Sequence, residues 1–249
     1  MEVAARGREF VRVVGPDAAD YLQRMVSNDV EALAHGEACP ALLLTAKARV
    51  IAPLVVLRRA DDDFLLLTEP GLGEAARTQL TRMRLRARCE IEPEEHESML
   101  VFGDADGFAT DWPNAGEALD AGLEATLSEE ELELRRIENG VPRWEREIDD
   151  RILPAEAGLD ETHVSFSKGC YPGQEPVARL HFRGHPNRGL RVVELAEVPE
   201  YDAPLLHDGR EVGRATSAAV REDGTVVALA FVRTEVPNDA PLALAARTG

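Results

Sequence analysis

The sequence of 249 residues predicts an α+β protein, and two patterns carry this prediction. Between Val50 and Ile91 the strand and helix patterns follow one another as β-β-α-β, and no further alternating strand–helix pairs continue the unit. From residue 186 to 249, short strand patterns are separated by Asp-Gly, Gly-Arg and Pro-Asn turns, which predicts a small antiparallel barrel.

The first 48 residues predict a strand, a helix and a second strand. Apolar residues alternate over Phe10–Val14, as in a half-buried strand, and residues Asp17–Met25 have helical periodicity with Asp17 as the candidate N-cap. The apolar run Ala41–Thr45 predicts the second strand.

The β-β-α-β unit comes next, with an acidic turn at residues 61–63 between its first two strands. Its predicted elements are the strands Ile51–Leu57 and Phe64–Thr68, the helix Gly73–Met83 and the strand Leu85–Ile91. The glycines at Gly71 and Gly73 imitate a dinucleotide-binding fingerprint, but the single β-α-β unit argues against a nicotinamide or flavin site.

Residues 98–184 predict one more strand at Ser98–Phe102, a connection rich in Gly, Asp and Pro, and a helix at Ser128–Ile137. Ser128 and Glu131 stand at capping-box spacing at the start of this helix.

Composition limits the classes of partner. The formal net charge of −18 disfavours strong nucleic-acid binding and attraction to anionic lipid, and no apolar run is long enough to span a membrane. Three widely spaced cysteines argue against a disulfide framework, so a cytoplasmic location is expected. A local basic cluster follows residue 178 and could receive an anionic ligand tail: Arg179, His181, Arg183, His185, Arg188 and Arg191. We predict no metal site, because Gly184 and Pro186 interrupt the helical spacing of the two histidines in this cluster.

The most informative segment is Phe166–Ala178, whose glycines and prolines predict a tight turn with Pro176 at a first helical position. Cys170 would then precede a helix N-terminus, with Lys168 and Arg179 near it in sequence, and both features favour the thiolate. The chain contains only one other lysine, Lys47, which suggests that the compact ammonium of Lys168 is needed. The alternative is that Cys170 is a small packed residue, as we expect Cys39 and Cys89 to be.

The segment Lys168-Gly-Cys-Tyr-Pro-Gly-Gln-Glu175 resembles the K-G-C-[FY]-x-G-Q-E signature of the YgfZ family, folate-binding relatives of the glycine-cleavage T protein, GcvT. Other segments agree with the resemblance along most of the chain: Val14–Ala18, Ser27–Val30, Arg136–Pro142, Leu153–Glu156 and Val212–Ser217.

This resemblance implies a ring of three domains. The first is discontinuous and comprises residues 1–48 with 98–184. Residues 49–97 would form an inserted ferredoxin-like domain, and residues 185–249 a C-terminal β-barrel.

The resemblance also implies a ligand, tetrahydrofolate or a related reduced folate. Glu138 matches the T-protein glutamate thought to grip the pterin, since a carboxylate can accept two hydrogen bonds from the amino-pyrimidinone edge. The matching motifs add further expected folate contacts at Arg136, Gln174, Glu175 and Arg179. Cys170 and Lys168 are expected to be the functional thiol and its cation.

Three functions stay open. By resemblance, the first is an accessory protein that supports iron–sulfur enzymes, including those that thiolate tRNA, with iron–sulfur client or assembly proteins as partners. The second is an aminomethyltransferase, but Ala52 and Pro53 occupy the positions of the paired aspartates of T proteins, and neither can hold a proton. The third is a folate-independent scaffold for protein contacts.

Overall fold

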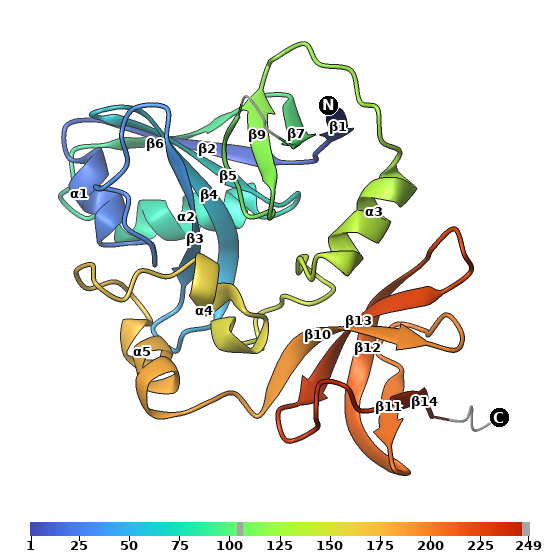
Figure 1. The fold of residues 1–249 in the computed structure, drawn as a ribbon. Helices are drawn as coiled ribbons and strands as arrows, with labels where there is room; N and C mark the ends of the chain where they lie inside the picture. Colours follow the sequence, from blue (N-terminus) through green and yellow to red (C-terminus); the bar gives the residue numbers. More distant parts are fainter. Residues whose placement is uncertain (104–106, 246–249) are drawn as a thin grey trace.

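The computed structural model describes residues 1–103 and 107–245, so the last four residues of the predicted barrel domain lie outside it. Three antiparallel sheets are joined by five α-helices and one 3₁₀ helix in this part of the chain (Figure 1). The helices are α1 (Ala18–Gln23), α2 (Gly73–Met83), α3 (Glu129–Glu138), η1 (Pro154–Glu156), α4 (Leu159–Thr162) and α5 (Gln174–Arg183). The strands are β1 (Glu2–Ala5), β2 (Glu9–Val14), β3 (Ala38–Leu44), β4 (Val50–Ala60), β5 (Asp63–Thr68), β6 (Glu90–Glu94), β7 (Ser98–Phe102), β8 (Phe108–Ala109), β9 (Ala115–Leu119), β10 (Arg188–Leu195), β11 (Pro204–His207), β12 (Arg210–Val220), β13 (Val226–Arg233) and β14 (Ala243–Leu244).

One of the two five-stranded sheets, which we call the large sheet, has the strand order β3-β4-β5-β2-β6. Helices α1 and α2 pack on one face, where Leu22 and Leu80 join the apolar side chains of the strands in one core. Strand β2 lies between β5 and β6, so β2, α1, β4, β5, α2 and β6 form the split β-α-β arrangement of a ferredoxin-like unit.

This sheet contains strands from both sides of the domain boundary predicted between residues 48 and 49. Strands β2 and β3 come from the predicted first domain, yet they share ladders and a core with β4, β5 and β6. The ferredoxin-like unit therefore starts at β2 rather than at residue 49. Strand β6 also begins at Glu90, five residues later than predicted, because Leu85 adopts a left-handed backbone conformation with φ of 49°.

A smaller sheet with the order β1-β7-β9-β8 lies beside the other face of the large sheet, where Phe108 and Leu119 pack against Phe10 and Leu65. The third sheet follows the order β10-β13-β12-β11-β14. In the described part of the chain no ladder joins its edge strands β10 and β14, so it is an open sheet and not the closed barrel that we predicted. The predicted boundary at 184/185 falls between α5 and β10.

Helix α3 and the segment from residue 141 to α5 connect the sheets. Ile137 of α3 packs against Val227 and Leu229 of β13. The segment after α3 contributes Ile148 and Tyr171 to a core that extends from β3 and β4 to Phe231 of β13. The capping box predicted for α3 is confirmed: Glu131 N donates to Ser128 Oγ at 3.2 Å and Ser128 N donates to Glu131 Oε2 at 2.7 Å.

Candidate functional site

The candidate site is a cleft of about 970 Å³ between the small sheet, α3 and the end of β12. Apolar and charged side chains both line it, among them Leu100, Trp112, Val141, Arg6, Glu69, Glu133, Arg136, Arg143 and Arg221. Leu100, Trp112 and Val141 are buried members of one apolar cluster, which makes this wall of the cleft firm. Clefts of this size and mixed lining are typical of small-molecule sites.

Of the carboxylates that line the cleft, Glu133 and Glu69 are in different states. Glu133 is paired, because Arg136 Nε donates to its Oε2 at 2.8 Å and Arg143 lies 3.3 Å from the same oxygen. Glu69 makes no side-chain hydrogen bond or ion pair with the residues that the structure describes. Burial raises the pKa of the Glu69 carboxyl, although Arg6 and Arg8 act in the opposite direction. Glu69 is therefore a half-buried lining carboxylate with free acceptor capacity.

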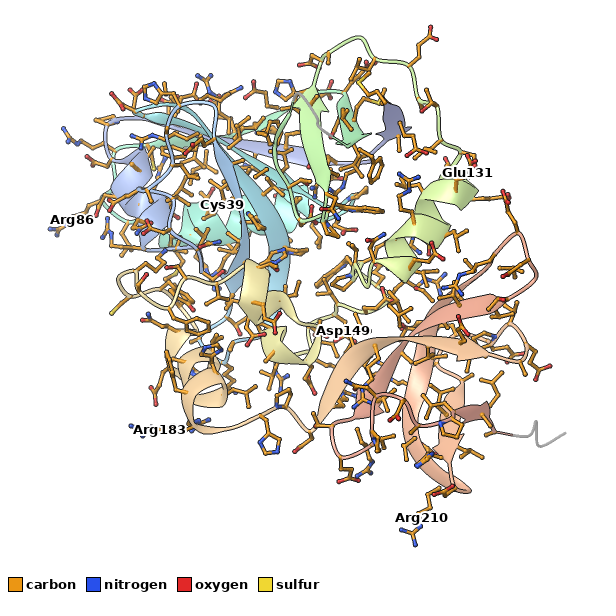
Figure 2. The ribbon with its side chains drawn as sticks, in the orientation of Figure 1. Cys39, Arg86, Glu131, Asp149, Arg183 and Arg210 are labelled. Atoms are coloured by element: carbon orange, nitrogen blue, oxygen red, sulfur yellow. The ribbon has the colours of Figure 1, made fainter. Side chains whose placement is uncertain are left out.

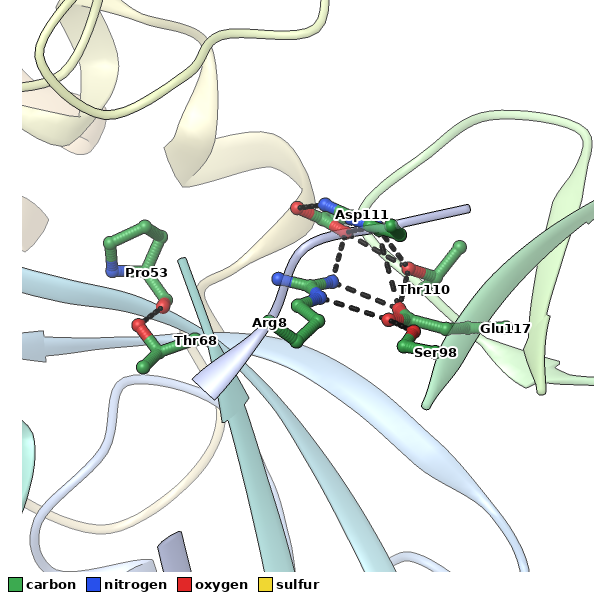
Figure 3. A network of polar contacts seen from close by, with 8 residues as sticks. Arg8, Pro53, Thr68, Ser98, Thr110, Asp111 and Glu117 are labelled. Atoms are coloured by element: carbon green, nitrogen blue, oxygen red, sulfur yellow. Dashed lines mark hydrogen bonds and ion pairs between the residues drawn. The ribbon is translucent and has the colours of Figure 1, made fainter. Parts of the chain in front are cut away.

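A buried charge network stands beside this part of the cleft (Figure 3). Arg8 donates from Nε to Glu117 Oε1 at 2.9 Å and from Nη2 to Asp111 Oδ1 at 3.0 Å. Arg6 joins it through Asp111 Oδ2 at 2.8 Å, and Ser98 Oγ donates to Glu117 at 2.7 Å. The two guanidinium groups outweigh the burial penalty, so the pKa of Asp111 lies well below its usual value and that of Glu117 is lowered to about 2. Both carboxyl groups are therefore ionised near neutral pH.

His163 lies close to this network and is almost completely buried. Burial lowers the pKa of its imidazole to about 4, against the attraction of Asp111. Its ring Nδ1 is 2.7 Å from Thr162 Oγ1, and its carbonyl oxygen accepts a hydrogen bond from Ser27 Oγ at 2.6 Å. His163 is therefore a neutral group that locks the end of α4 against the segment after α1.

Arg136, a predicted folate contact, is held by the protein itself. Its Nη1 donates to Val141 O at 2.6 Å and to Glu147 Oε2 at 3.1 Å, in addition to the pairing with Glu133. The fully buried Glu147 carboxylate also accepts hydrogen bonds from Thr216 and Ser217 of β12, at 2.7 Å each. Arg136 thus joins α3 to the C-terminal sheet, and its guanidinium has little capacity left for a ligand.

Glu138 does not line the cleft. It lies at the end of α3, and its Oε1 accepts a hydrogen bond from Arg221 Nε at 2.7 Å on the surface. The pterin contact assigned to Glu138 from the sequence stays a prediction, and Glu138 Oε1 is already paired with Arg221. Glu138 reaches the cleft only through Arg221, which stands at the rim.

Lys168 does not direct its ammonium toward the cysteine as expected. Its Nζ donates to the carbonyl oxygens of Gln23 at 2.6 Å, Val26 at 2.7 Å and Asn28 at 2.8 Å, which uses all three of its donors. Burial lowers the pKa of Lys168 to about 8. The signature lysine therefore ties its loop to the turn that follows α1.

The rest of the signature exposes its thiol. Gly169 and Cys170 are exposed, whereas Tyr171 and Gly173 on the other side are buried. Helix α5 begins at Gln174, so Pro176 is its third residue rather than its first. Cys89 is buried in the core, and Cys39 is half-buried on β3 with a thiol pKa that burial raises to about 12, so the two packing assignments are confirmed.

The remaining predicted contacts lie on α5. Gln174 is half-buried, and Glu175 and Arg179 are exposed. None of the three lines the cleft, and neither Cys170 nor Lys168 does. The structure therefore separates the predicted site into a cleft beside α3 and an exposed signature loop before α5.

At the positions that match the T-protein aspartates, β4 carries no ionisable group. Ala52 is fully buried and is paired with Leu43 of β3. The carbonyl oxygen of Pro53 accepts a hydrogen bond from Thr68 Oγ1 at 2.8 Å (Figure 3).

Sequence analysis missed the lining residues Arg6, Glu69, Trp112 and Arg143 and the network of Arg8, Asp111 and Glu117. They come from segments far apart in the chain, as in the contact of Arg6 with Glu117 across 111 residues. One local signal was present, since Arg6 and Arg8 have the alternating spacing that directs both side chains to the same side of an extended segment.

Known proteins agree with this architecture. Residues 7–103 match the GCVT N-terminal domain. The chain is 26% identical to the tRNA-modifying protein YgfZ of Klebsiella pneumoniae, over 91% of this chain and 83% of that protein. It is also 26% identical to a mitochondrial iron–sulfur cluster assembly factor homologue of Pyricularia oryzae, over 96% of this chain and 73% of that protein. A crystal structure of the glycine cleavage system aminomethyltransferase T from Bartonella henselae superposes with a TM-score of 0.77 at 17% identity, covering 93% of this chain and 78% of that one.

The fold is thus that of the GcvT-type proteins, three sheets arranged around an interdomain cleft. Together with the signature at residues 168–175, these likenesses support the assignment of the chain as a YgfZ-type family member. Among the described residues, no helix combines the length and apolar character that crossing a membrane requires.

Proposed function

We propose that this chain is a folate-binding accessory protein that acts in the cytoplasm to support iron–sulfur proteins, including those that modify tRNA. The observation that carries the proposal is the signature loop. Lys168 and Gly173 are used to hold the loop in place, while Cys170 between them is left exposed. A loop so firmly anchored around an accessible thiol suits transient contact with a cluster-carrying partner. The names of two relatives, a tRNA-modifying protein and an iron–sulfur assembly factor, support the same function.

The cleft has the chemistry that a reduced folate needs. Its volume suits a ligand of that size, and Trp112 and Leu100 belong to its apolar wall. Glu69 supplies a carboxylate without a partner among the described residues, which would accept the N–H groups of the amino-pyrimidinone edge. Arg143 and Arg221 would receive the carboxylates of the glutamate tail. The donor and acceptor set therefore fits folate, with Glu69 in the place first assigned to Glu138.

Calorimetric titration with 5-formyltetrahydrofolate tests the ligand. We expect saturable one-to-one binding that added folate analogues displace. The cellular function is tested separately, in a bacterial strain that lacks its own YgfZ-type protein, by the level of tRNA thiolation after expression of this chain. Folate binding without restored thiolation would leave only a folate-binding protein, and restored thiolation without folate binding would favour the folate-independent scaffold.

The second candidate, an aminomethyltransferase, shares the fold but is disfavoured by the absence of a carboxylate at Ala52 and Pro53. Two buried carboxylates, Asp111 and Glu117, could in principle replace the missing ones, but they form ion pairs with Arg6 and Arg8. A group in such a network is a poor proton acceptor, because its pKa is already lowered.

A further inference from the structure

The turn between α2 and β6 carries a cluster of arginines that is unusual in a chain with a net charge of −18. Residues 82–86 read Arg-Met-Arg-Leu-Arg, and we call them the 82–86 tip. Arg82 donates only to Gln79 Oε1, and Arg84 only to the carbonyl oxygen of Cys89. Arg86 has no hydrogen-bond or ion-pair partner in the described residues. All three charges of the tip thus lack a carboxylate partner within this part of the chain.

The same tip exposes apolar side chains. Leu85 is 87% exposed and Met83 is 39% exposed. Leu85 also holds the left-handed conformation, which costs conformational energy for a leucine and would cost none for a glycine. Placing an exposed leucine at this strained position has no benefit for the folded chain itself, so contact with another molecule is the simplest physical reason for it.

A hollow of about 610 Å³ adjoins the tip. Its apolar wall is made of Met25, Met83, Leu85 and Ala87, with the buried Tyr21 behind it, and Tyr21 Oη is satisfied by Leu80 O at 2.6 Å. Flexible methionines allow such a wall to adapt to different inserted side chains. The hollow is therefore suited to an apolar side chain flanked by charge.

The charges around the hollow are unbalanced. Arg24, Arg84 and Arg86 line it, together with a single carboxylate, Asp17, which is held by Arg88 at 2.8 Å. Arg24 lies beside Asp20 at 2.5 Å, outside the lining. Figure 2 shows Arg86 projecting into solvent beside α1, on the side of the molecule away from the C-terminal sheet. The excess positive charge is accessible to a partner.

We propose that the 82–86 tip and its hollow bind an acidic protein segment that inserts an apolar side chain. The arginines would pair with the carboxylates of the segment, and the wall of Met25, Met83 and Leu85 would bury its anchor. A nucleic acid would match only the arginines of this surface, because a phosphate backbone offers no apolar side chain to fill the hollow. This surface is separate from the cleft and does not depend on folate binding.

Fluorescence anisotropy with three synthetic peptides tests the proposal. The first carries Asp and Glu with Leu at i, i+3, i+4 and i+7, the second keeps the acids but has Ser for Leu, and the third keeps Leu but has Lys for the acids. We expect the first peptide to bind the full chain with a Kd that rises several-fold from about 50 to about 300 mM NaCl. The second should bind about tenfold more weakly, and the third should not bind.

Substitutions locate the contact. Leu85→Ser should weaken binding of the first peptide about fivefold or more, because it removes an exposed apolar side chain of the tip. The double variant Arg82→Glu with Arg86→Glu should abolish binding, because it reverses two positive charges of the tip. Arg183→Glu, in an exposed position at the end of α5, is the matched charge control and should leave the Kd unchanged. Equal losses in the control, no binding of the first peptide, or an oligouridine that binds the tip more tightly than the peptide would each overturn the proposal.

Discussion

Gly173 packs against Thr45 so closely that a Cβ atom at residue 173 would lie 2.6 Å from the carbonyl oxygen of Thr45. Gly173 also has a φ of 84°, which L side chains rarely adopt. The second glycine of the signature is therefore needed twice, once for its backbone conformation and once for its contact with the β3–β4 turn. This contact sets the start of α5 and the position of the exposed loop before it.

Replacing Gly173 with alanine should lower the free energy of unfolding by about 2–5 kcal/mol, the sum of a left-handed alanine and an overpacked contact. Gly36→Ala is the matched control, because Gly36 has a φ of 83° but a Cβ atom added there would meet nothing within 4 Å. The control should lose only about 1–2 kcal/mol. Urea denaturation of both variants measures the difference, and equal losses would show that the contact with Thr45 relaxes without cost.

Local patterns predicted much of the secondary structure. Helix α2 has the predicted bounds Gly73–Met83, because its apolar residues keep helical spacing and Gly73 and Leu80 are buried on one face. The capping box of α3 was readable for the same reason, since both partners lie within one turn. The order of the strands in the sheet could not be predicted from local patterns. Strand β2 pairs with β5 across some 50 residues, and only tertiary packing decides such a pairing.

The site was predicted less well than the fold. Motifs identified Lys168 and Cys170 as important, but three carbonyl groups more than 130 residues away decide what Lys168 does. Likewise, the motif that contains Glu138 did not indicate that Arg221, 83 residues away, donates a hydrogen bond to its carboxylate. Long-range ion pairs of this kind are not encoded in local spacing, so the sequence could not show that Arg136 and Glu138 are already paired within the chain.

The free energy of unfolding should decrease at acid pH because of His163. Its folded pKa of about 4 lies below the ordinary value of 6.5, so the unfolded chain binds more protons between these values. The stabilising contribution of the neutral ring is complete above pH 6.5 and is lost as the pH falls through 4, by up to about 3 kcal/mol. Denaturation of the wild type and of His163→Gln at stepped pH measures this. Parallel profiles for the two proteins in that window would contradict it.

Folate affinity should depend on Glu69 and not on Glu138. Glu69→Gln exchanges a charged acceptor for an amide and should weaken binding of 5-formyltetrahydrofolate about tenfold, the effect of one charge-assisted hydrogen bond. Glu138→Gln changes a carboxylate outside the cleft lining that is already paired with Arg221, and it should leave the affinity within about twofold. Calorimetry on both variants decides between the two residues. The reverse ranking would return the pterin contact to Glu138.

The chain should not transfer an aminomethyl group from a lipoylated carrier protein to tetrahydrofolate. Ala52 and Pro53 remove the carboxylates that general acid–base catalysis would use, a contribution of roughly 10²–10⁴-fold in rate. A reconstituted glycine-cleavage assay with a true T protein as the positive control measures formation of methylenetetrahydrofolate. Turnover within about tenfold of that control would require another base in this cleft and would revive the transferase as the function.

Cys170 should be the reactive thiol of the folded chain and the residue that the cellular function needs. It is exposed, whereas burial raises the pKa of Cys89 and brings that of Cys39 to about 12, so iodoacetamide should alkylate Cys170 at least about tenfold faster than either. Cys170→Ala should keep the unfolding free energy and the folate affinity, because its side chain packs against neither the core clusters nor the cleft. The variant should nevertheless fail to restore tRNA thiolation in cells that lack the native protein, while Cys39→Ala restores it. Full restoration by Cys170→Ala would show that the anchored loop serves only to hold α5 against the β3–β4 turn.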